Sequence, residues 1–245
     1  EVQQHMPSPE SPLDNLFVSV YRAFIITQCH LGQGDLENAW GHAENALRQA
    51  ERYTGPQSTS GATLAPLLAE MAYERMNLDS LNTLLADRLE FIDRFGPPDA
   101  LSRCYTYLAR QALNDDMPHE AERLLEHAQR LAVSRGWQRP QALLLAEQAR
   151  VRLQRANYPG AEQLHRQLEQ LAARATIDAE NPCQRAIAQH ANVSRSRLLL
   201  ASGQAPQASL LLGELVTEQE RRGDRLSAAR LRTLWSLSLW NSGEN

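Results

Sequence analysis

The amino-acid sequence predicts an all-α protein, arranged as a right-handed superhelix of stacked antiparallel helical hairpins. The first observation is composition: Ala, Leu, Gln, Arg and Glu dominate, all strong helix formers, and only 12 of the 245 residues are Gly. The second is that clusters of turn-forming residues divide the chain at regular intervals. The third is a pair of mostly small residues that recurs at one fixed spacing.

The turn clusters define the expected elements in order. Residues 1–13 include three prolines among polar neighbours and are expected to form a flexible lead-in. Residues 14–245 are expected to form a single domain of about five hairpins plus one extra helix. The clusters of Gly, Pro, Asn and Asp lie at residues 52–63, 94–99, 134–140, 178–183 and 221–224. Each interval between two clusters has room for two helical segments and a shorter turn.

A small residue is expected just inside the second helix of each hairpin, because two helix backbones approach closely only where side chains are small. Each such residue has a partner twelve positions earlier in the first helix. The pairs are Thr27 with Ala39, Ala69 with Leu81, Ala109 with Ala121, Ala149 with Ala161, and Ser196 with Ala208. The second pair is less regular, since Leu81 is large. The resulting period of about 40 residues is typical of a helical-repeat protein.

The last helical segment, residues 224–240, is expected to be the first helix of a sixth unit whose second helix is absent from this sequence. Trp235 and Trp240 are then expected to be partly exposed. Because an exposed apolar patch favours self-association, a homodimer is one expected assembly.

Small residues twelve apart with a turn between them resemble the tetratricopeptide repeat (TPR), although a period near 40 is longer than its 34 residues. The longer repeats are similar to the superhelical sensor region of MalT-type regulators, the large ATP-binding branch of the LuxR-type transcription activators. The phrases that carry this resemblance are RGWQRPQALLLAEQARVRLQRANYPGAEQL (135–164) and ERRGDRLSAARLRTLWSLSL (220–239).

The resemblance implies a bacterial transcription regulator with an ATP-binding module before this region and a helix-turn-helix module after it. This chain has neither: it contains no lysine and therefore no GxxxxGK[ST] phosphate-binding loop, so we expect no cofactor here and ATP elsewhere. The expected role is a sensing domain for a small-molecule inducer or a regulatory protein. The alternative is a stand-alone TPR-like scaffold that binds a peptide or protein partner.

The candidate ligand site follows from the repeat register. If the first helices line a concave groove, the residue after each first-helix marker points into it; these residues are Gln28, Glu70, Arg110, Arg150 and Arg197. The three arginines suit an anionic or polyhydroxylated ligand. Alternatively, they are solvated or paired with neighbouring carboxylates such as Glu147. Among nearby aromatic residues, Tyr105 is expected in the core, and Tyr107 is the better candidate for exposure to the ligand.

Other functions have weak support. His119 and His127 lie eight residues apart, about 12 Å along a helix, so they cannot share one metal ion, and no metal site is expected. No nucleophile-base or paired-carboxylate motif is recognisable, so we do not expect an enzyme. The basic residues near 221–232 alternate with acidic ones and the formal net charge is −4, which argues against direct contact with nucleic acid.

Two further features concern the cellular compartment. Cys29, Cys104 and Cys183 are isolated, which favours neither a disulfide framework nor a zinc site and fits a reducing, cytoplasmic compartment. No apolar run approaches the length of a membrane span, so no membrane partner is expected. The chain begins with Glu1 rather than Met, and we expect it to be part of a longer protein.

Overall fold

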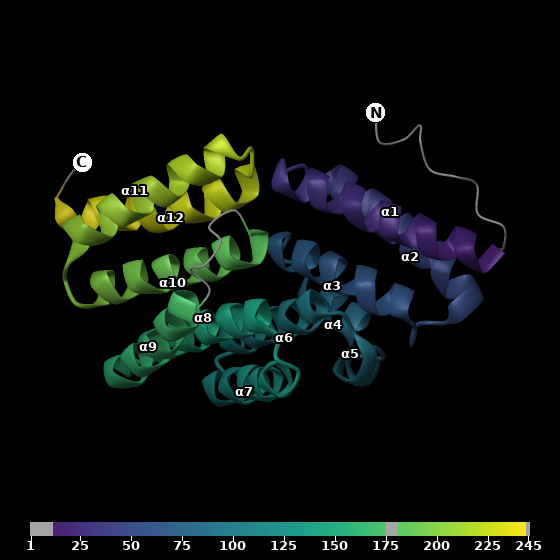
Figure 1. The fold of residues 1–245 in the computed structure, drawn as a ribbon, viewed down its shortest axis with the longest axis horizontal. Coiled ribbons are helices and arrows are strands. Elements are labelled where there is room, and N and C mark those ends of the chain that lie inside the picture. Colours follow the sequence, from purple (N-terminus) through teal and green to yellow (C-terminus); the bar gives the residue numbers. More distant parts are fainter. Residues whose placement is uncertain (1–11, 175–180, 244–245) are drawn as a thin grey trace. The chain divides into compact units, whose positions relative to one another are not determined.

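The computed structural model describes residues 12–174 and 181–243, which form twelve helices and no strand (Figure 1). The helices are α1 (Pro12–Gly32), α2 (Leu36–Thr54), α3 (Thr59–Glu74), α4 (Leu78–Leu85), α5 (Leu89–Phe95), α6 (Pro98–Asn114), α7 (Pro118–Ser134), α8 (Gln138–Gln154), α9 (Tyr158–Arg174), α10 (Pro182–Ala201), α11 (Ala205–Arg221) and α12 (Arg225–Ser242). The all-α prediction is therefore confirmed. Of the expected lead-in, residues 1–11 lie outside the described part.

The chain divides into two compact units. The N-terminal unit comprises residues 1–31 and 35–97 and holds α1 to α5, whereas the C-terminal unit comprises residues 32–34 and 98–245 and holds α6 to α12. The expectation of one continuous domain over 14–245 stays a prediction.

Helical hairpins build the C-terminal unit. Each of α6, α8 and α10 packs against the helix that follows it, and α8 also contacts α6, α7 and α10. A helix with neighbours on so many sides must be buried around most of its circumference. Accordingly, α8 buries nine of its seventeen residues, including the polar residues Glu147 and Gln148.

The predicted marker residues are buried at the helix contacts. Thr27, Ala39, Ala69, Leu81, Ala121, Ala161, Ser196 and Ala208 have no exposed surface, and Ala109 and Ala149 are 1% exposed. The burial expected at a helix contact is thus present at every marker, including Leu81, which is large. These contacts form the core of each unit.

The short turns of the hairpins share one backbone conformation. A residue with positive φ stands five positions before each second-helix marker: Gly34, Met76, Asp116, Ala156 and Gly203. The next backbone N–H then bonds to a carbonyl of the finished helix, as Asn157 does to Arg152 over 2.9 Å. This is the hydrogen bond of a Schellman cap, which usually uses glycine. Three of the five turns have Met76, Asp116 or Ala156 at this position. The spacing of glycines in the sequence therefore does not reveal that the five turns share one conformation.

The second hairpin departs from the prediction of two helices. Its second half is broken into α4 and α5 at residues 86–88. Arg88 is 8% exposed there; its guanidinium donates to the Leu84 carbonyl over 2.7 Å and pairs with Glu51 of α2. The side chain of Arg88 thus bonds to α4 and to α2 at the point where the helix is interrupted.

The extra helix α12 packs against α11. The Trp235 ring lies against Gly213, and its Nε1 donates to Ser209 Oγ over 3.0 Å. Trp240, one and a half turns later, is 73% exposed. The expected partial exposure of the two tryptophans is present, mostly at Trp240.

Candidate functional site

Three successive first helices bring the predicted arginines together in the C-terminal unit. Arg110 follows the buried marker Ala109 on α6, Arg150 follows Ala149 on α8, and Arg197 follows Ser196 on α10. Since α8 contacts both α6 and α10, the same register places the three side chains next to one another. We call this set, with Glu147, the arginine cluster.

Glu147 is the centre of the arginine cluster. It lies one helical turn before Arg150 on the same face of α8, and its side chain is 4% exposed. Arg110 grips the carboxylate with two hydrogen bonds, Nη2 to Oε1 over 2.7 Å and Nε to Oε2 over 3.2 Å. Arg150 Nε donates to Oε2 over 2.8 Å. The alternative interpretation, pairing of the arginines with Glu147, is therefore present for two of the three.

The electrostatics of the cluster follow from this burial. Burial by itself would raise the pKa of the Glu147 carboxyl, but the positive charges of Arg110 and then Arg150 outweigh it and hold the pKa well below its ordinary value. Burial also lowers the pKa of Arg197 to about 10, partly offset by attraction to Glu147. Arg197 forms no hydrogen bond or ion pair with any other residue in the described part of the chain.

Tyr107 corrects one expectation. It was the better candidate for exposure, but it is only 4% exposed, nearly the same as Tyr105 at 5%. Its hydroxyl accepts a hydrogen bond from Arg230 of α12 over 3.2 Å, and the Arg110 guanidinium lies 5.1 Å from its ring centroid. The ring of Tyr107 thus packs against the guanidinium group of Arg110 and is not exposed for contact with a ligand.

Two residues join this site without a signal in the sequence. Arg230 reaches Tyr107 of α6 from α12, 123 residues further along the chain. His190 of α10 is half-buried, and burial lowers its pKa to about 4, with Glu147 pulling in the opposite direction. It is therefore a neutral neighbour of the arginine cluster at pH 7.

The remaining predicted ligand residues lie in the N-terminal unit. Gln28 is half-buried on α1, and Glu70 is 7% exposed on α3, where it takes part in an interaction within the chain. Their assignment to a ligand site stays a prediction. The arginine cluster with Tyr107 is the part of the predicted set that the structure gathers in one place.

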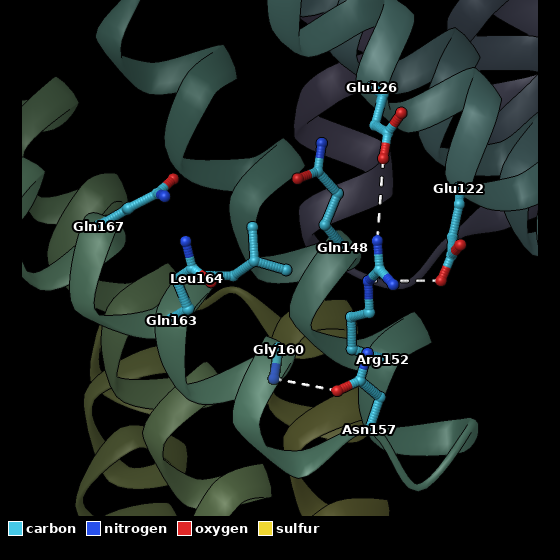
Figure 2. A pocket seen from close by; sticks show the side chains of 9 residues that line it. All are labelled: Glu122, Glu126, Gln148, Arg152, Asn157, Gly160, Gln163, Leu164 and Gln167. Carbon is cyan, nitrogen blue, oxygen red and sulfur yellow. Dashed lines mark hydrogen bonds and ion pairs between the residues drawn. The ribbon is translucent and has the colours of Figure 1, made fainter.

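A second polar site lies between α7, α8 and α9. It is a pocket of about 350 Å³ whose lining includes the amides of Gln148, Asn157, Gln163 and Gln167 (Figure 2). Figure 2 also shows the Arg152 guanidinium held between Glu122 at 3.3 Å and Glu126 at 3.8 Å. Gln148 and Arg152 are one turn apart and face away from Glu147 and Arg150, so α8 presents two different polar faces.

Metal and membrane chemistry find no support in the described residues. His119 faces the Arg155 guanidinium and His127 packs on Tyr105 with ring centroids 5.2 Å apart. Within residues 12–174 and 181–243, no three His, Cys, Asp or Glu side chains are grouped as metal ligands. In the same residues, no helix has both the length and the apolar character of a membrane span.

Comparison with known proteins decides the family. The sequence model of the MalT-like TPR region matches residues 2–245, almost the whole chain. The chain belongs to the MalT-like TPR region family. The resemblance inferred from the RGW and GD phrases is thereby confirmed, together with the TPR-like repeat scaffold it implies. No curated protein matches the chain.

Solved structures support the same fold. The repeats are similar to the nearly identical TPR-like repeats of a Podosopora anserina protein described as a kinesin light chain. A single-substitution variant of that protein matches with a TM-score of 0.54 and 18% identity over 83% of this chain and 95% of the other. A second structure of that protein matches with a TM-score of 0.53 and 18% identity, over 83% of this chain and 94% of the other. At this identity the likeness of this MalT-like TPR region extends to fold alone.

Proposed function

We propose that this chain is the ligand- or protein-sensing region of a MalT-like transcription regulator of the LuxR family. The family match over residues 2–245 carries the proposal. The regulator would hold its ATP-binding and helix-turn-helix modules outside this region and act in the bacterial cytoplasm. The chain itself would contact neither DNA nor membrane, and would carry out no catalysis.

The arginine cluster is the proposed place of sensing. A repeat scaffold sets its specificity with a few side chains on a generic frame, so the site rather than the fold must supply recognition. Arg110, Arg150 and Arg197 come from three different hairpins. A ligand that contacts all three would favour one relative arrangement of α6, α8 and α10, which is how binding would be transmitted to neighbouring modules.

The test uses the full-length protein encoded by the source gene. Its self-association is measured by sedimentation with and without ATP and with candidate inducers, and compared with the Arg110→Gln, Arg150→Gln, Arg197→Gln triple variant. We expect inducer-dependent assembly in the native protein and loss of the inducer response in the variant. A gene that encodes neither flanking module would overturn the proposal.

The second candidate function is a scaffold for a peptide or protein partner. The amide-lined pocket of Figure 2 favours it, because an amide side chain offers one donor group and one acceptor, which matches an extended peptide backbone. A purified chain that retains a bound protein, with no response to nucleotide in the full-length protein, would favour this function over sensing of a small molecule.

A further inference from the structure

One donor group in the arginine cluster has no acceptor. Arg150 Nη2 is buried and forms no hydrogen bond with the described residues, whereas Arg150 Nε donates to Glu147 and Nη1 lies 3.4 Å from Gln154 Oε1. A buried donor without a partner costs free energy, and more so when the group is charged. In native proteins a ligand, an ion or an ordered water usually completes such a group.

Glu147 does not supply the missing acceptor in this structure. Its Oε1 already accepts from Arg110, and its Oε2 accepts from both Arg110 and Arg150. Arg197, the third member, is attracted to Glu147 without a hydrogen bond and is repelled by Arg150 and Arg110. The carboxylate of Glu147 thus pairs with Arg110 and with Nε of Arg150, and it leaves Arg150 Nη2 and the whole of Arg197 without a hydrogen bond to it.

The neighbouring groups do not add negative charge. His190 is neutral at pH 7. The carboxylate of Asp99 lies 3.5 Å from Arg139, whose positive charge offsets the negative charge of Asp99. Partly buried positive charge without a contacting counter-ion is costly, and an anion that accepts hydrogen bonds from planar guanidinium groups removes that cost.

We propose that Arg150 and Arg197 form an anion-binding site for an oxyanion group, a phosphate or a carboxylate, carried by a small-molecule ligand. Glu147 holds Arg110 and Arg150 in place and competes with the ligand for their donor groups. The side chain of Arg150 is 18% exposed, so an oxyanion from solvent can reach its guanidinium group while Nε stays bonded to Glu147. The identity of this ligand as an inducer rests on the proposed function, but binding of the anion does not.

The experiment titrates the chain with inorganic phosphate and, separately, with acetate, at constant ionic strength set with chloride. Binding is followed by calorimetry and by the shift in Tm. We expect at least one of the two anions to bind and stabilise the native protein. Phosphate alone would point to a phosphorylated ligand, and acetate alone or both to a carboxylate-bearing ligand. Absence of binding by either anion overturns the proposal without any variant.

Three variants and one control variant locate the site. Arg150→Gln and Arg197→Gln are each expected to weaken binding about tenfold or more, since each removes a charge-assisted hydrogen bond. Glu147→Gln is expected to strengthen binding, because it removes the competing carboxylate. Arg195→Gln is the matched control, exposed on the same helix two residues from Arg197, and should bind as the native chain does. Equal weakening in Arg195→Gln and Arg197→Gln would indicate nonspecific binding and overturn the assignment.

The outcome is separable from that of the proposed function. A neutral inducer that acts on the full-length protein, with no anion bound by this chain, would leave the sensing function intact and remove the anion site. Anion binding that requires Arg150 and Arg197, with a full-length protein indifferent to inducer and nucleotide, would keep the anion site and remove the sensing function.

Discussion

Arg110 of α6 and Glu147 of α8 join two consecutive hairpins through a pair of hydrogen bonds, at 2.7 and 3.2 Å, to a carboxylate that is 4% exposed. The contact spans 37 residues, close to the repeat period. A fork-to-carboxylate pair of this kind fixes direction as well as distance, because both guanidinium donors and both carboxylate oxygens must align. It therefore holds α6 and α8 in one register.

Replacing Glu147 by Gln is expected to destabilise the chain by about 3–5 kcal/mol at pH 7, because buried guanidinium groups lose their counter-ion. The pKa of Glu147 is depressed in the folded state, so its contribution is present above the ordinary pKa of 4.5 and is lost as pH falls through the folded pKa. Urea unfolding of both proteins at pH 7 and at acidic pH measures this. The difference between them should shrink only below about pH 4.5.

Glu126→Gln is the matched control for that measurement. Glu126 also faces an arginine, Arg152 at 3.8 Å, but its side chain is 53% exposed. Screening by water limits such a pair to about 1 kcal/mol or less. Equal losses in the two variants would contradict a special role for burial at Glu147.

His190 predicts a loss of stability on mild acidification. Burial lowers its pKa to about 4 from an ordinary 6.5. Because the unfolded chain takes up the proton first, stability is complete above pH 6.5 and falls progressively between pH 6.5 and 4. Between pH 7 and pH 5 the expected loss is about 2 kcal/mol. Urea unfolding of the native chain and of His190→Gln at pH 7 and pH 5 tests this prediction. The variant should lose about 2 kcal/mol less unfolding free energy between the two pH values than the native chain does.

The left-handed turns predict opposite effects of two exchanges. Ala156 has a φ of 54° in the turn between α8 and α9, a conformation that costs an L-residue about 1–2 kcal/mol. Ala156→Gly is therefore expected to stabilise the chain by up to about 1 kcal/mol, once the greater entropy of unfolded glycine is subtracted. Thermal unfolding measures the change.

Gly203→Ala is the reverse experiment. Gly203 occupies the equivalent turn with a φ of 75°, and a Cβ there would meet no atom within 4 Å. Any loss of unfolding free energy in Gly203→Ala therefore comes from the backbone conformation alone. We expect a loss of about 1 kcal/mol. If both exchanges shift Tm in the same direction, the left-handed turn is not the cause.

The marker positions predict sensitivity to added volume. Ala208 has no exposed surface at the contact of α11 with α10, so Ala208→Leu is expected to cost about 1–3 kcal/mol through overpacking. Gln207→Leu introduces the same side chain at the preceding, exposed position of α11 and should change stability by about 0.5 kcal/mol or less. A similar tolerance at both positions would mean that close helix approach does not need the small residue.

Much of the local structure could be predicted because its causes are local. Clusters of Gly and Pro end helices wherever they occur, so the hairpin boundaries were predictable. The break between α4 and α5 was not: no cluster of Gly or Pro marks residues 86–88, and the contact of Arg88 with Glu51 joins residues 37 positions apart. The regular left-handed turns were also hidden, since Met76, Asp116 and Ala156 carry no glycine signal.

The candidate site shows the same division. Register alone predicted that Arg110, Arg150 and Arg197 share a wall, because each follows a buried marker. Register could not show that Tyr107 is buried or that its hydroxyl accepts a hydrogen bond from Arg230, 123 residues away on α12.

The sequence by itself determined the helical hairpins, their small-residue contacts and the family, because helix periodicity, turn chemistry and backbone approach act within one repeat. Only the tertiary structure decided that Arg110 and Arg150 share the carboxylate of Glu147, that Arg197 does not contact it, and that Arg150 Nη2 lacks an acceptor. The reason is geometric: a charge pair acts over a few ångströms, and the distances among α6, α8 and α10 are set by how whole helices pack.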